Sequence, residues 1–173
     1  MNEIINAMKG RRSIRNFKPD MVPKEVIDEI IEAGLFAASG RNKQGAIIIS
    51  VTDKELRDRI MEMNRKIGGW DEGFDPFYGA PAMLIVLGDK SVPTFVYDGS
   101  LVMGNLMLAA HTLGIGSCWI HRAKQEFESE EGKAILKELG IEGEFEGIGH
   151  CAIGYPAEEK DIIPRKENRV FYK

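Results

Sequence analysis

The amino-acid sequence predicts a fold of mixed α-helices and β-strands in one domain spanning residues 1–173. Three observations carry this prediction. The chain is long enough to bury one hydrophobic core. The spacing of apolar residues alternates between helical and strand-like along the chain. We find no internal repeat, low-complexity tract or linker that would divide the chain into separate units.

Helices are predicted where apolar residues recur three and four positions apart. The expected helices cover residues 2–10, 23–37, 52–67, 98–113 and 129–139. Pro23 suits the first turn of the second helix. Thr52 and Glu55 have the spacing of a capping box at the start of the third helix, and Gly68 ends it.

Strands are predicted at residues 46–51, 82–87, 117–121 and 146–153. The run from Ala82 to Leu87 is apolar throughout, which is typical of a central strand covered on both faces. Residues 70–78 lack a regular period and are predicted to form a loop. Its four aromatic residues either pack on the surface or form a lid over a site, and they are Trp70, Phe74, Phe77 and Tyr78.

Two segments indicate a second copy of the chain. The helix at 98–113 is apolar on nearly all sides, so a subunit interface is expected to cover one of them. Gly99, Ser100 and Gly104 would let another backbone approach it closely. The polar tail from residue 156 ends in an apolar group at 170–172, which is expected to dock on the partner subunit.

Composition excludes several classes of protein. The net charge of −4 argues against a dedicated nucleic-acid binder. The first residues lack the basic region of a secretory signal, and no run of about 18 apolar residues would span a membrane. Cys118 and Cys151 are far apart and lack metal-ligand spacing, so we expect two buried thiols, no metal site and a cytoplasmic location.

A basic segment near the N-terminus is the strongest candidate site. Arg11, Arg12, Ser13 and Arg15 place three guanidinium groups and a hydroxyl within five residues, which suits a phosphate. In an extended segment Arg11, Ser13 and Arg15 point the same way. The alternative is a solvated basic patch. The stretch 38–45 is either a set of donors for the rim of a heterocycle or an ordinary turn from helix to strand.

Four motifs in sequence order resemble those of the nitroreductase family of flavin-dependent oxidoreductases. The segment at 11–17, RRSIRNF, resembles the family's phosphate-binding RRSxRxF, and ASGRNKQ at 38–44 resembles PSGxNxQPW. The segment at 113–120, LGIGSCWI, is similar to an LGLGSCW-like stretch. Finally, GYP at 154–156 followed by PRK at 164–166 is similar to the closing GYP…KPRK.

The resemblance implies an α+β fold with a central, mostly antiparallel sheet flanked by helices. It also implies an interlocked homodimer whose C-terminal tails reach the partner, with two FMN molecules at the interface. The residues that would hold the FMN phosphate and ribityl chain are Arg11, Arg12, Ser13, Arg15 and Arg165. Those that would pack by the flavin ring from the other subunit are Ala38, Ser39, Gly40, Asn42 and Gln44. Those that would line the opposite side are Trp119, Ile120, His121 and Arg122.

The activity implied is transfer of hydride from NADH or NADPH to FMN and then to a nitroaromatic, a quinone or a similar acceptor, by a ping-pong cycle. No catalytic side chain is expected. A backbone N–H near His121 or Arg122 would approach the flavin N5.

Two other interpretations stay open from the sequence. Instead of an enzyme, the chain would be a module that stores or senses FMN without turnover. Alternatively, its basic clusters would bind an acidic protein partner. The three histidines are given structural interpretations. We expect His111 in the core, His121 beside the flavin edge and His150 at the end of a strand.

Overall fold

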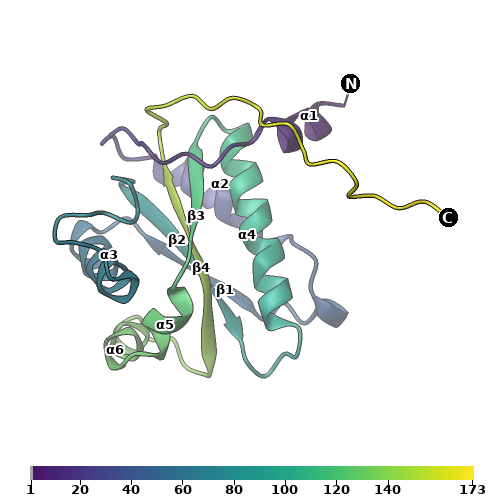
Figure 1. Cartoon of the computed structure of the whole chain (residues 1–173). Coiled ribbons are helices and arrows are strands. Elements are labelled where there is room, and N and C mark those ends of the chain that lie inside the picture. Colours follow the sequence, from purple (N-terminus) through teal and green to yellow (C-terminus); the bar gives the residue numbers. More distant parts are fainter. Residues whose placement is uncertain (1) are drawn as a thin grey trace.

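A computed structural model places a four-stranded antiparallel sheet between two layers of helices (Figure 1). The structure describes residues 2–173, and Met1, the first residue of the predicted domain, lies outside the described residues. The strands are β1 (Ala46–Val51), β2 (Ala82–Asp89), β3 (Gly116–Ile120) and β4 (Phe145–Gly154), in the order β1-β2-β4-β3. The α+β fold with a central antiparallel sheet is therefore confirmed.

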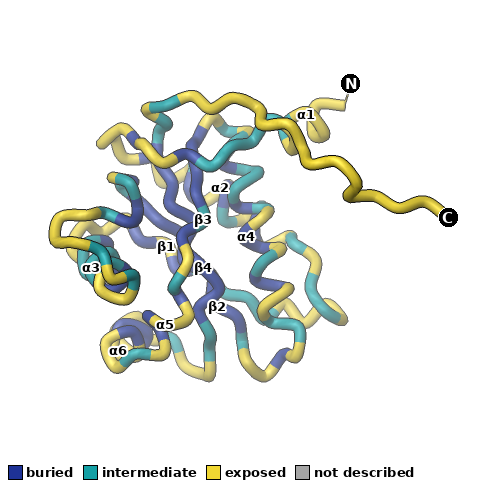
Figure 2. The backbone as a smooth tube through the Cα atoms, viewed as in Figure 1, coloured by how far each residue is buried: buried dark blue, intermediate teal, exposed yellow. Residues whose placement is uncertain are grey.

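Strand β2 occupies the interior of the sheet, as its apolar run predicts. It pairs with β1 on one side and β4 on the other, and every residue from Ala82 to Gly88 is buried. The pairing with β4 shifts register between Val86 and Leu87. Because helices cover both faces, the strand needs no polar side (Figure 2).

One face of the sheet is covered by α2 (Lys24–Leu35) and α4 (Phe95–Thr112) (Figure 1). Helix α4 starts three residues earlier than predicted and buries Met103 and Leu106. Gly99 faces the sheet, where an added Cβ would lie 2.6 Å from Cγ1 of Ile148. Its small size thus serves packing within this chain, contrary to the prediction, whereas a Cβ at Gly104 would meet open space.

The opposite face is covered by α3 (Lys54–Gly68), α5 (Ala123–Glu128) and α6 (Glu130–Glu138) (Figure 1). The predicted capping box is wrong. Asp53 is the N-cap of α3, and its carboxylate accepts a hydrogen bond of 2.8 Å from the Leu56 N–H. Helix α5 was not predicted, because six residues are too few to display a helical period.

Both ends of the chain lie at one edge of the molecule. Helix α1 (Glu3–Gly10) leads into an extended segment along β3, where the Ile14 N–H donates to Ser117 O at 2.9 Å. The tail beyond β4 runs past α1 and then away from the body (Figure 1). Phe171 and Tyr172 are about nine-tenths exposed, so no other part of residues 2–173 covers the apolar end of the tail (Figure 2).

The two cysteines are free and buried, as predicted. Burial raises the pKa of the Cys151 thiol to about 12. Within residues 2–173, no helix is long and apolar enough to cross a membrane.

Candidate functional site

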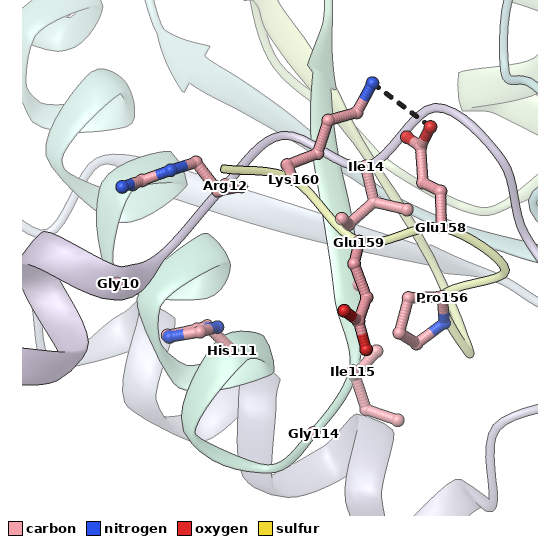
Figure 3. A pocket seen from close by; sticks show the side chains of 11 residues that line it. Gly10, Arg12, Ile14, His111, Gly114, Ile115, Pro156, Glu158, Glu159 and Lys160 are labelled. Carbon is pink, nitrogen blue, oxygen red and sulfur yellow. Dashed lines mark ion pairs between the residues drawn. The ribbon is translucent and has the colours of Figure 1, made fainter. Parts of the chain in front are cut away.

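The basic segment borders a cavity of about 390 Å³ at the C-terminal end of α4 (Figure 3). Its walls come from the end of α1, the turn between α4 and β3, and the first residues after β4. The lining residues are Gly10, Arg12, Ile14, His111, Gly114, Ile115, Gly116, Pro156, Glu158, Glu159 and Lys160. Segments far apart in sequence therefore meet where the sequence predicts a phosphate site.

Arg11 has an unsatisfied guanidinium nitrogen beside this site. Its Nη1 atom is buried and has no hydrogen-bond partner among the described residues, and the same holds for Oγ of Ser117. Leaving a buried polar group unpaired costs about 1–3 kcal/mol, and more for a charged group. Such donors suit an anionic ligand, so these two residues fit the phosphate end of a flavin mononucleotide.

Arg12 is engaged with the backbone. Its Nη1 donates to Lys9 O at 2.8 Å, and its Nε donates to Asp161 O at 3.1 Å. The side chain therefore ties α1 to the start of the tail. This arrangement gives Arg12 a structural task in addition to its predicted place beside the phosphate.

Glu158 is a site residue that the sequence analysis missed. Its carboxylate accepts a hydrogen bond of 2.6 Å from the Arg15 N–H and forms an ion pair of 3.1 Å with Lys160 (Figure 3). The hydrogen bond from the Arg15 backbone, aided by Lys160, lowers the pKa of this carboxyl. No sequence motif signals this contact, because the partners are 143 positions apart.

The apolar helix around His111 predicted a core position for this residue, and that prediction is wrong. It is half-buried and lines the cavity (Figure 3). Desolvation lowers its pKa below 6.5, and the positive charges of Arg11 and Arg12 add to the effect. The imidazole is therefore held toward its neutral form beside the basic segment.

The turn at 38–44 lies at the other end of α4. The Gly40 N–H donates to Oδ1 of Asp98 at 2.9 Å, and Asp98 lies in the first turn of α4. His111, in the last turn, is thirteen residues further along, which is about 20 Å in an α-helix. One chain thus does not bring the turn and the basic segment together.

The turn itself has an unusual backbone. Arg41, Asn42 and Gln44 all adopt left-handed conformations, with φ between 50° and 55°. The Gln44 N–H donates to Oγ of Ser39 at 3.0 Å, which closes the turn. Ala38 and Ser39 line a small cavity beside Asp98.

The residues from 119 to 122 do not all offer side chains to one site. Trp119 and Ile120 are neighbours in β3 and point to opposite faces, and the Ile120 side chain lies in the core under α3 and α5. His121 is exposed, and Arg122 has φ 83° at the turn into α5. Ile120 can therefore contribute only its backbone.

The aromatic loop at 70–78 packs beside this turn. The guanidinium of Arg122 lies 4.3 Å from the ring centroid of Trp70, within cation–π range. Phe74 in turn packs 5.0 Å from Trp70 between ring centroids. The loop therefore borders the predicted flavin edge.

Arg165 lies on the exposed tail, four residues beyond Asp161, whose carbonyl Arg12 contacts. Its guanidinium donates to Ile163 O, two residues earlier, at 2.6 Å. Among the described residues, no hydrogen bond joins Arg165 to Arg11 or Arg15.

Comparison with known proteins shows which family this chain matches. The family model described as "Nitroreductase family" matches residues 8–155. The chain is 31% identical over 167 residues to a protein of Archaeoglobus fulgidus assigned as an NADH dehydrogenase/NAD(P)H nitroreductase, covering 94% of this chain and 90% of that protein. It is 26% identical to an FMN reductase [NAD(P)H] of Bacillus subtilis, covering 95% of this chain and 70% of the relative.

A crystal structure of a Bacteroides fragilis nitroreductase with bound FMN superposes with a TM-score of 0.89 at 26% identity. The match covers 100% of both chains. The fold, the order of the motifs and the sequence match all indicate the same family. The chain belongs to the nitroreductase family.

Proposed function

We propose that this protein is an FMN-dependent oxidoreductase that uses NADH or NADPH to reduce an electron-poor acceptor such as a nitroaromatic or a quinone. The observation that carries the proposal is the buried, partnerless guanidinium nitrogen of Arg11 within the basic segment. A polar group left unpaired at this position is accounted for by an anion that the chain binds. The names of its relatives, a nitroreductase and an FMN reductase, support the same activity.

The phosphate and ribityl chain of FMN would be held by Arg11, Ser13 and Arg15, with Arg12 keeping the segment in place. Arg15 is exposed, so its guanidinium is free to reach a ligand above the sheet edge. Arg165 would join from the tail. Bidentate guanidinium groups match phosphate oxygens in geometry as well as in charge.

A second copy of the chain would complete the site. Within one chain, the turn at 38–44 and the basic segment lie at opposite ends of α4. Helix α4 exposes Val96, Tyr97 and Leu101, and the exposed fraction of Tyr97 is 73%. An antiparallel pairing of two copies along this helix would cover that surface and bring the turn of one copy to the basic segment of the other.

FMN, when bound, supplies the hydride chemistry. The chain's own task is to bind and orient. The turn at 121–122 would present a backbone N–H at the flavin N5, and the aromatic loop at 70–78 would shield that edge from water. Because NAD(P)H and the acceptor would use the same open face in turn, we propose a ping-pong cycle.

The test is spectroscopic. Purified protein should be yellow or become so on adding FMN, lose its colour with NADH or NADPH under anaerobic conditions, and regain it with a nitroaromatic or a quinone. Protein that binds FMN but is not bleached by either nicotinamide would be a storage or sensing module. Protein that takes up no FMN would contradict both functions and favour an acidic protein partner for the basic segment.

A further inference from the structure

A buried group of polar side chains lies directly beneath the turn at 121–122. It consists of Asn64 from α3, Glu126 from α5 and His150 from β4, and each is at most 1% exposed. Burying a carboxylate and an imidazole is costly unless they are paired. Apolar residues would fill a purely structural core at this position at a lower cost in desolvation free energy. The buried polar group therefore requires an explanation.

The three side chains are joined to one another. Nε2 of His150 lies 2.6 Å from Oε2 of Glu126, a direct contact that lacks the alignment of a regular hydrogen bond. The Asn64 amide donates to the other carboxylate oxygen, Oε1 of Glu126. Phe77 packs edge-on against the imidazole at 5.2 Å between centroids and keeps water away.

The free donors of the group reach two consecutive carbonyls of the turn. Nδ1–H of His150 donates to Ile120 O at 3.3 Å, since a carbonyl oxygen can only accept. Nδ2–H of Asn64 donates to His121 O at 2.9 Å. Ile120 is the last residue of β3, so its pairing with β4 holds its carbonyl together with the imidazole, and Asn64 holds the carbonyl of His121.

A trans peptide is planar, so its N–H points away from its carbonyl oxygen. Ile120 O shares a peptide with the His121 N–H, and His121 O shares one with the Arg122 N–H. Within residues 2–173, neither N–H donates to another protein group. Both N–H groups thus point away from these partners, toward the edge where the flavin is expected.

We infer that Asn64, Glu126 and His150 are positioning residues that fix the backbone donors of His121 and Arg122 for the flavin. This inference rests on the proposed function for the identity of the ligand, but the orientation of the two N–H groups is a property of the chain alone. Arg122 adopts a left-handed conformation, which strains a non-glycine residue, and the group beneath it offsets that strain.

The principal experiment compares Asn64→Leu with Glu126→Gln in ¹⁵N-labelled protein without added flavin. Asn64→Leu removes the donor to His121 O at similar volume. The NMR order parameters (S²) of the His121 and Arg122 backbone amides should then fall from about 0.85, typical of rigid backbone, to below about 0.6. In Glu126→Gln the new amide still accepts from Asn64 and donates to Nε2 of a neutral His150, so both order parameters should stay rigid.

The same variants are then titrated with FMN. Asn64→Leu should raise the dissociation constant about tenfold, the scale of a lost buried hydrogen bond, and Glu126→Gln should stay within about twofold. Lys124→Met is the matched control, because Lys124 is half-exposed on α5 and pairs with Glu128 and Glu146. If Asn64→Leu does not fold, Asn64→Ser, which is too short to reach both partners, replaces it.

Rigid amides and unchanged FMN affinity in the Asn64 variant would overturn the inference, and so would loosening in Glu126→Gln as large as in Asn64→Leu. Failure of the wild-type protein to bind FMN would overturn the proposed function instead. In that case the amide measurement would still decide whether the group positions the turn.

Discussion

Arg11 and His111 lie beside the same cavity, and the positive charge of Arg11 opposes protonation of the His111 imidazole. Arg11 has a buried nitrogen without a partner, and His111 titrates below its ordinary value because of desolvation and the two neighbouring arginines. A bound phosphate would change the balance for both residues, since it supplies an acceptor and negative charge together.

The first prediction concerns Arg11. Arg11→Ala removes a charged group whose Nη1 has no partner within residues 2–173, so affinity for FMN should fall at least about tenfold, because a hydrogen bond to a charged group is worth about 1.5–3 kcal/mol. Quenching of FMN fluorescence on titration measures it. Lys133→Ala, a surface change on α6, should leave the affinity unchanged. Full affinity in the Arg11 variant would contradict the assignment of the phosphate.

The second prediction concerns pH. The pKa of His111 is lower in the folded chain than the value of 6.5 expected when unfolded, so the unfolded chain takes up this proton first as the pH falls. The contribution of neutral His111 to the free energy of unfolding is full above pH 6.5 and declines as the pH falls below it. Urea unfolding of the flavin-free protein across this window should show a shallower loss in His111→Gln than in wild type. An identical pH dependence of the free energy of unfolding in the two proteins would contradict the lowered pKa of His111.

At the scale of elements, the turn into α5 depends on how closely that helix packs on β4. Gly147 lies beneath the start of α5, where an added Cβ would be 2.2 Å from the carbonyl of Ala123. The same close packing brings Glu126 to His150. Sequence periodicity found β4 but not α5, because the short helix is specified by its contacts with the strand and not by its own pattern.

The third prediction follows from this packing. Gly147→Ala must displace backbone atoms of α5, so the free energy of unfolding should fall by about 1–3 kcal/mol, the usual cost of overpacking a core. Chemical denaturation measures the change. Glu142→Ala, at an exposed position of the preceding turn, should stay within about 0.5 kcal/mol of wild type. Equal stability of the two variants would show that α5 can move without cost.

At the scale of the whole molecule, α4 separates the two halves of the expected site. Its buried face holds the sheet and α2, and Nδ2–H of Asn105 donates to Ala33 O of α2 at 3.1 Å. Its other face carries exposed apolar residues in the single chain. The proposed homodimer would explain both this surface and the distance between the halves.

The fourth prediction tests that assembly. Leu101 is 51% exposed on α4, and a buried glutamate in a subunit interface would lack a partner. Leu101→Glu should therefore shift the protein from dimer to monomer in sedimentation velocity and remove bound FMN. Leu139→Glu makes the same change at a 44% exposed position after α6 and should leave the dimer intact. A dimer that persists with FMN in the Leu101 variant would place the interface elsewhere.

Much of the fold was predictable because its signals are local. Four strands and five of the six α-helices follow from hydrophobic period, with boundaries that differ by a few residues. The cap of α3 was misplaced by one position, since Thr52 and Asp53 are both competent caps and only the backbone geometry selects Asp53. The site was partly predictable. The basic segment borders a cavity, whereas Arg165 is not among the described residues that line it.

The sequence by itself determined the alternation of helices and strands, the basic segment and the motif order that identifies the family, because each depends on residues close together in the chain. Only the tertiary structure decided that His150 lies buried against Glu126 and that His111 lines a cavity. It also decided that α4 keeps the turn at 38–44 away from Arg11. These relations join residues distant in sequence, and such contacts are set by the packing of whole elements, which no local pattern records.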